Sequence, residues 1–171
     1  GVKCVWMPGR RIDMDHALKA AQTISSEIVL DKVLERVMRV VLSSAGAQRG
    51  FLALERDGEL WVEAVLSLNP QRAEIGTHTP LTERSDWAAS IAHYVVRTRE
   101  LVLLGNAIKD SRFSNDAYIQ SQRPKSILCM ALQNKGRLSG VLYLENNSST
   151  DAFTSDRVEL LRILSSQATI S

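Results

Sequence analysis

Three histidines, His16, His78 and His93, could take part in chemistry, because imidazole binds metals and transfers protons near neutral pH. None has a second ligand-type residue at the spacing of a zinc site, so the sequence does not favour a metal centre built by the protein. His93 follows an apolar alanine in a segment with helical periodicity, where it could contact a ligand or a heme iron. We interpret it as an ordinary half-buried histidine and keep it as a candidate ligand contact.

A second group of chemically capable residues lies in a polar stretch of the chain, and consists of Asp110, Arg112 and Asp116. The planar guanidinium of Arg112 could hold an anionic ligand. The alternative, which we favour, is that Asp110 and Arg112 bind each other and fix the loop that contains them.

Aromatic side chains offer a third kind of site. Trp61, Trp87 and Tyr118 could line an apolar cavity, although aromatic residues at such spacings more often belong to an ordinary core. The sequence alone leaves both alternatives open.

Catalytic motifs are missing from the sequence. There is no G-x-S-x-G elbow, no Walker loop, no G-x-G-x-x-G and no kinase active-site motif, so we expect that this chain is not itself an enzyme. Of the two cysteines, Cys129 lies in the apolar run SILCMAL, where cysteine behaves as a small hydrophobic residue, and Cys4 lies near the N-terminus. A disulfide between them has no support, and a cytoplasmic location is the simplest interpretation.

The composition is that of a globular protein with one domain. The chain has 171 residues, of which 44% are hydrophobic and 23% charged, and its net charge is +2. The cations are scattered rather than gathered, which argues against nucleic acid as a partner, and no apolar run is long enough for a membrane helix. We expect residues 1–12 to be a linker or a cloning boundary and residues 13–171 to form a single domain.

The N-terminal part predicts two amphipathic helices. Apolar residues recur at helical spacing over residues 13–27, with an aspartate near the start. A second helix is expected from a cap at Asp31 to Ala45, and Gly46 is a natural stop.

The rest of the chain predicts hairpins and further helices. Residues 50–56 and 59–67 alternate like strands around Asp57-Gly58, and residues 126–133 and 137–145 do so around a turn at 134–136. Between these hairpins, the sequence favours a loop at 67–84, a helix capped by Ser85 or Asp86, a short strand at 101–104, and a long connection with one short helix at 116–121. A helix capped by Thr154 should run from Ser155 to the chain end. This order predicts an α+β fold with a mainly antiparallel sheet and helices on its faces.

Several segments in this order resemble the GAF family of sensory domains. They are SAGAQRGFLALERDGELWVEA, SIAHYVVRTRELVLLGNA, IKDSRFSND and SILCMALQNKGRLSGVLYLENNSSTDAF, followed by the C-terminal helix. The sequence of these segments is especially similar to that of GAF domains in bacterial sensor histidine kinases. The resemblance implies a central antiparallel sheet of about six strands, helices on both faces, terminal helices packed together on one side, and a ligand pocket on the other. It also implies that GRLSGVLYLEN is a central strand.

The resemblance has informative departures. GAF domains of cyclic-nucleotide phosphodiesterases carry an Asn-Lys…Phe…Asp-Glu pattern, of which Asn106, Phe113 and Asp116 are only a partial match. Neither cysteine is placed like the chromophore attachment site of bilin-binding relatives. The sequence therefore implies neither a cyclic nucleotide nor a bilin, and it demands no cofactor. The candidate ligand-binding residues are Trp87, His93, Asn106, Asp110, Arg112 and Tyr118.

The predicted function is that of a regulatory module in a signalling protein. The resemblance implies a sensor that binds an unknown small molecule or a partner, forms a homodimer through its N- and C-terminal helices, and passes a signal to a kinase module downstream in the parent chain. Two alternatives stay open. One is an enzyme similar to free methionine-(R)-sulfoxide reductase, which would need a reactive cysteine, and the other is a dimerisation spacer without a ligand.

Overall fold

The computed structural model describes the backbone of residues 8–170 and the side chains of residues 14–23 and 29–163. Cys4 and most of the expected linker lie outside these residues, so the predicted domain boundary stays a prediction. Among the described residues, no helix is long and apolar enough to cross a membrane.

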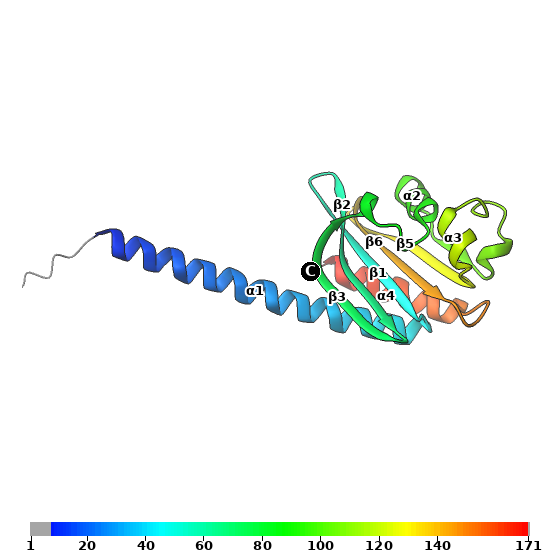
Figure 1. Cartoon of the computed structure of the whole chain (residues 1–171), viewed down its shortest axis with the longest axis horizontal. Helices are drawn as coiled ribbons and strands as arrows, with labels where there is room; N and C mark the ends of the chain where they lie inside the picture. The colour runs from blue at the N-terminus through cyan, green and yellow to red at the C-terminus, as the bar shows by residue number, and fades with distance from the viewer. Residues whose placement is uncertain (1–7, 171) are drawn as a thin grey trace, which may run out of the picture.

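A six-stranded antiparallel sheet forms the centre of the fold, with strand order β3-β2-β1-β6-β5-β4 (Figure 1). The stretch GRLSGVLYLEN falls in β6, between β1 and β5, which confirms its prediction as a central strand. The strands are β1 (Arg49–Arg56), β2 (Glu59–Leu68), β3 (Gln71–Pro80), β4 (Val102–Leu104), β5 (Ser126–Asn134) and β6 (Arg137–Asn146).

Both predicted hairpins are confirmed, and their turn residues explain them. Asp57 and Gly58 have φ of 53° and 82°, and Lys135 and Gly136 have φ of 52° and 79°. Positive φ at both central positions gives a two-residue turn whose twist matches that of the flanking strands.

The loop predicted at 67–84 is wrong, because most of it is the edge strand β3 (Gln71–Pro80). The strand has a neighbour on one side only, and most of its side chains are exposed, so it carries no apolar alternation. Proline and glycine, which suggested a loop, are tolerated at the ends and bulges of edge strands.

The two predicted N-terminal helices are one continuous helix, α1 (Pro8–Ala45), which projects far beyond the sheet (Figure 1). The prediction of a break treated Asp31 as a helix cap, but neither glycine nor proline lies between residues 27 and 31, so nothing interrupts the backbone hydrogen bonds. The predicted stop is confirmed, since Gly46 follows the helix with φ of 74°.

The remaining helices are α2 (Ala89–Thr98), α3 (Ala117–Gln122) and α4 (Ser155–Ile170), with 3-10 turns η1 (Leu81–Glu83) and η2 (Ala107–Lys109). The cap predicted for α2 is wrong. Its N-cap is Ala88, without a side-chain hydrogen bond, and Asp86 forms ion pairs instead. The short helix predicted near residue 116 is confirmed as α3, whose first amides are capped by Asp116.

The helices cover both faces of the sheet, as predicted. The terminal helices α1 and α4 pack together on one face, and α2 and α3 lie on the other (Figure 1). Because side chains alternate along a strand, β6 contributes Leu142 and Leu144 to the core under α1 and α4, and Val141 and Tyr143 to the core under α2. The central strand thus contacts both helical layers.

Candidate functional site

A buried carboxylate, Glu145, lies at the end of β6, on the face that α2 and α3 cover. It is 0% exposed and is surrounded by hydrogen-bond donors. The Tyr143 hydroxyl donates to Oε1 at 2.6 Å, and the Tyr118 hydroxyl donates to Oε2 at 2.9 Å. Such a carboxylate is stable without water only because these donors, and one cation, compensate for its lost hydration.

Arg49, at the start of β1, supplies that cation. Its Nη1 lies 3.3 Å from Oε2 of Glu145 and donates to the backbone oxygen of Asp86 at 2.9 Å and to the Tyr118 hydroxyl. Tyr118 therefore accepts from Arg49 and donates to Glu145. One side chain of α3 is in this way joined to two strands of the sheet.

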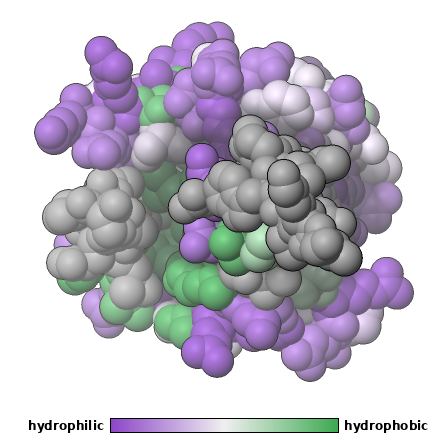
Figure 2. Space-filling model, turned by 90° about the vertical axis from the view of Figure 1, so that its left-hand side faces the viewer, coloured by the Kyte–Doolittle hydropathy of each residue, from purple (hydrophilic) through white to green (hydrophobic). Residues whose placement is uncertain are grey.

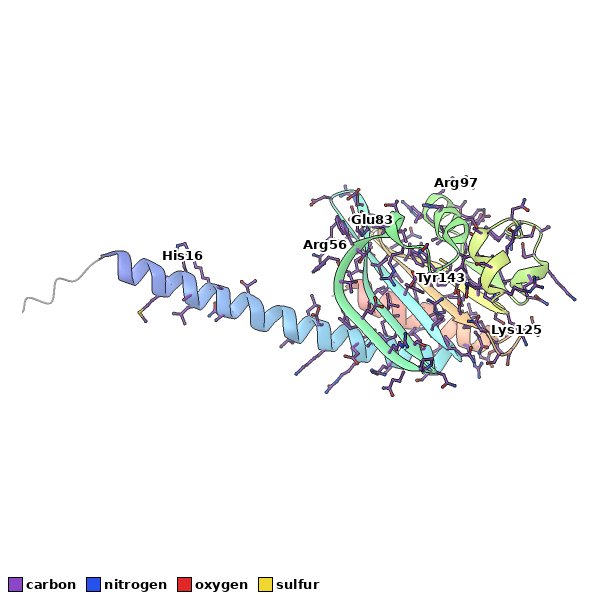
Figure 3. All side chains as sticks on the ribbon, viewed as in Figure 1. His16, Arg56, Glu83, Arg97, Lys125 and Tyr143 are labelled. Atoms are coloured by element: carbon purple, nitrogen blue, oxygen red, sulfur yellow. The ribbon has the colours of Figure 1, made fainter. Side chains whose placement is uncertain are left out.

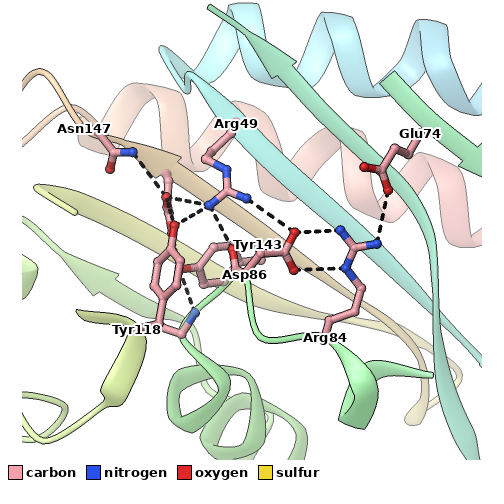
Figure 4. Close-up of polar contacts among 9 residues, drawn as sticks. Arg49, Glu74, Arg84, Asp86, Tyr118, Tyr143 and Asn147 are labelled. Atoms are coloured by element: carbon pink, nitrogen blue, oxygen red, sulfur yellow. Dashed lines mark hydrogen bonds and ion pairs between the residues drawn. The ribbon is translucent and has the colours of Figure 1, made fainter. Parts of the chain in front are cut away.

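The network continues towards the edge of the sheet through Arg84. Its guanidinium binds Asp86 with two hydrogen bonds, at 3.0 and 2.6 Å, and Glu74 of β3 at 3.2 Å (Figure 4). Burial would raise the pKa of Asp86, but the hydrogen bonds and charge of Arg84 and the charge of Arg49 lower it below its ordinary value. The network of Arg49, Arg84, Asp86, Tyr118, Tyr143 and Glu145 is called the polar network below.

The two tyrosines of the polar network keep their protons at neutral pH. Burial raises the pKa of the Tyr118 and Tyr143 hydroxyls, and the Glu145 carboxylate raises both further. Each hydroxyl can then donate to Glu145 throughout the physiological range. The Tyr143 oxygen also accepts from the backbone amide of Ala88 at 3.2 Å, which fixes the start of α2.

Three aromatic rings lie beneath the polar network. Phe51, Trp87 and Tyr143 are each at most 1% exposed, and their ring centroids lie 5.1 to 5.7 Å apart. The guanidinium groups of Arg49 and Arg84 lie over the Phe51 ring, at 4.9 and 5.6 Å from its centroid. Trp87 Nε1 is the single buried side-chain donor or acceptor without a hydrogen-bond partner in the described part of the chain.

Comparison with known proteins gives the family of this fold. The model of the GAF domain matches residues 29–171, which is most of the chain. The chain belongs to the GAF family.

Relatives of this GAF domain are parts of much longer proteins. It is 25% identical, over 96% of its length, to hybrid signal transduction histidine kinase G of Dictyostelium discoideum. It is also 25% identical, over 94% of its length, to the peroxide stress-activated histidine kinase mak3 of Schizosaccharomyces pombe. The chain spans 8% and 7% of these two relatives, so their catalytic parts lie outside the matched region.

The fold has close structural counterparts. The crystal structure of the GAF domain from Acinetobacter phosphoenolpyruvate-protein phosphotransferase superimposes with a TM-score of 0.59. That match covers 92% of this chain and 90% of the other, at 24% identity, and shows a common fold. The resemblance inferred from the sequence is thereby confirmed, together with its α+β architecture.

In this GAF domain the structure does not gather the six predicted ligand-binding residues into one place. Trp87 packs with Phe51 and Tyr143 in the group of three aromatic rings, whereas Tyr118 belongs to the polar network. His93 is exposed on α2 and borders a separate hollow of about 240 Å³, whose walls include Leu60, Leu81 and Val96.

The other predicted residues lie along the connection between β4 and β5. Asp110 and Arg112 bind each other, with Arg112 Nη2 3.2 Å from Asp110 Oδ2, as the favoured interpretation expected. Asn106 precedes η2 and makes no capping hydrogen bond there. Asp116 joins two helices, since it caps α3 and accepts from the Ser90 amide of α2 at 3.0 Å.

Sequence reasoning missed Arg49, Glu145 and Tyr143. Each lies in or beside an apolar strand and shows no motif, and Arg49 and Glu145 are 96 residues apart in the chain. One signal was available, because a glutamate at the end of an otherwise apolar central strand must find partners when both faces of the sheet are covered.

Cys129 and the possible metal ligands bear on catalysis and metal binding by the described residues. Cys129 is 0% exposed on β5, and burial raises the pKa of its thiol, so it is far from the reactive thiolate that sulfoxide reduction requires. Within the described ranges, no group of three or more His, Cys, Asp and Glu side chains could hold a metal ion.

Proposed function

We propose that this GAF domain is the sensory input module of a multidomain signalling protein, of the kind found in bacterial sensor histidine kinases and located in the cytoplasm. A small molecule or a protein partner engages the face that α2 and α3 cover, at the polar network. The signal passes through the sheet to α1 and α4, and from there to a catalytic module elsewhere in the parent chain.

The observation that carries this proposal is the position of β6. The polar network holds one face of this strand through Tyr143 and Glu145, while Leu142 and Leu144 of the other face pack under the terminal helices. Gly50 of β1 reinforces the connection, because a Cβ there would lie 2.7 Å from Leu144 and 2.9 Å from Leu42 of α1. A structural change at the polar network can therefore reach α1 through the closely packed residues of β6 and β1.

Helix pairing between two copies is the second part of the proposal. Exposed apolar residues recur along α1, both beside the sheet and beyond it. Leu18, Val29 and Val40 are 57%, 60% and 56% exposed. Figure 2, which looks at the molecule from the side where α1 projects, shows hydrophobic surface near the centre of this view within a mostly hydrophilic periphery. Burial of such side chains by a second helix would stabilise a dimer.

The proposal is tested by native mass spectrometry against a panel of metabolites, combined with light scattering. We expect a dimer at micromolar concentration and a bound species that is lost in Glu145→Gln, with Glu59→Gln on the exposed hairpin as the control. A dimer without any bound species, co-purified material included, would leave only the role of a dimerisation spacer. A strict monomer would contradict helix pairing.

A further inference from the structure

The helix α1 leaves the body of the domain at Asp31. Every described side chain before it, residues 14–23, 29 and 30, is exposed, whereas Asp31 and Leu34 are partly buried. In Figure 3 the side chains around His16 stand in the open, away from the sheet. Asp31 is therefore the first described residue of α1 whose side chain is partly buried.

At this exit point α1 lies against a glycine of the edge strand. Gly76 of β3 has φ of 71°, and a Cβ added to it would lie 2.9 Å from Oδ2 and 3.1 Å from Oδ1 of Asp31. The Asp31 carboxylate can approach the strand this closely because residue 76 has no side chain.

Gly76 is part of a bulge that a buried carboxylate supports. Val62 pairs with Thr79 and Ala64 with Ile75, so Glu63 alone lies opposite residues 76–78. Glu63 is 2% exposed, and its Oε2 lies 3.0 Å from Nδ1 of His78, whose φ is 45°. Positive φ is unfavourable for histidine, and such a conformation persists where surrounding contacts hold it.

We infer that this bulge is the joint that sets the direction of α1, and that Glu63 and His78 are positioning residues that hold the joint in shape. The downstream half of α1 is fixed to the sheet through Leu34, Met38 and Leu42, so the bulge meets the helix where it becomes free. At a rise of 1.5 Å per residue, a helix pivoting near Leu42 turns a 1 Å displacement at Asp31 into about 2.5 Å at Met14. The use of this joint in signalling rests on the proposed function, but the joint itself does not.

The joint can be tested with Gly76→Ala and a matched control. Gly136→Ala places the same methyl group at a similar φ of 79°, where no atom lies within 4 Å. Both variants carry a similar backbone penalty, but only Gly76→Ala crowds the Asp31 carboxylate of α1. Spin labels on Lys19→Cys and Arg97→Cys, in Cys4→Ser protein diluted with unlabelled protein, report the distance between α1 and α2 by pulsed electron paramagnetic resonance. Cys129 is buried and should not react with the label.

We expect a shift of about 1 Å in the mean distance for Gly76→Ala, no shift for Gly136→Ala, and recovery of the wild-type distance in Gly76→Ala/Asp31→Ala. Asp31→Ala alone leaves the strand untouched and should broaden the distance distribution, because the contact that limits the helix is lost. Equal distances in Gly76→Ala and Gly136→Ala, or an unchanged distribution in Asp31→Ala, would overturn the inference. These distances do not depend on any ligand, so they separate failure of the joint from failure of the sensory proposal.

Discussion

Replacement of Arg49 by methionine is expected to lower the free energy of unfolding by about 3–5 kcal/mol, as removal of one partner of a buried ion pair does. Glu145 is 0% exposed, and Arg49 is its single cationic partner among the described contacts. Methionine fills much of the same volume, so the loss comes mainly from the uncompensated carboxylate. Urea denaturation of both proteins at pH 7 measures the difference.

The matched control is the double variant Arg49→Met/Glu145→Gln. It removes the carboxylate together with its cation and leaves an amide that Tyr118 and Tyr143 can still reach. We expect at least half of the lost stability to return. If the single variant were as stable as the wild type, or the double variant no better than the single one, the buried charge could not be what Arg49 stabilises.

Phe51→Ala is expected to lower the free energy of unfolding by about 3–5 kcal/mol, the usual loss for a buried phenylalanine. Its ring is 0% exposed between Trp87 and Tyr143, and the cavity left behind would lie directly beneath Arg49 and Arg84. The denaturant midpoint should fall while the slope stays constant.

Phe51→Leu is the control for Phe51→Ala. Leucine keeps most of the apolar volume, so we expect a loss below about 1.5 kcal/mol. A loss as large as that of alanine would mean that the stacked geometry of the rings, rather than the filled volume, stabilises this cluster.

The hairpins could be predicted from the sequence because their turns are encoded locally. Asp57-Gly58 and Lys135-Gly136 adopt the positive φ that such dipeptides favour, whatever the rest of the chain does. The C-terminal end of α1 could be predicted for the same reason, since Gly46 follows it.

The edge strand β3, in contrast, depends on tertiary context. β3 forms because β2 offers a free edge, and its exposed side chains leave no apolar alternation to read. The break predicted in α1 was wrong because an aspartate that can cap a helix can equally lie within one, and no glycine or proline between residues 27 and 31 interrupts the helix.

The candidate site also combines residues that could be predicted from the sequence with residues that could not. Trp87 and Tyr118 could be picked out by residue type, but Arg49 and Glu145 are neighbours only because β1 pairs with β6 in a register where Arg49 lies opposite Glu145. Register across strands so distant in the chain is not visible without a structure.

The central claim is that the polar network and the terminal helices are coupled through the sheet, and hydrogen exchange of Tyr118→Phe tests it most directly. This variant removes one hydroxyl and leaves every charge of the network in place. We expect faster amide exchange in α3, in β6 and in residues 34–45 of α1, because loosening one face of the central strand weakens its packing on the other. Faster exchange confined to residues 105–125, with α1 and α4 unchanged, would contradict it.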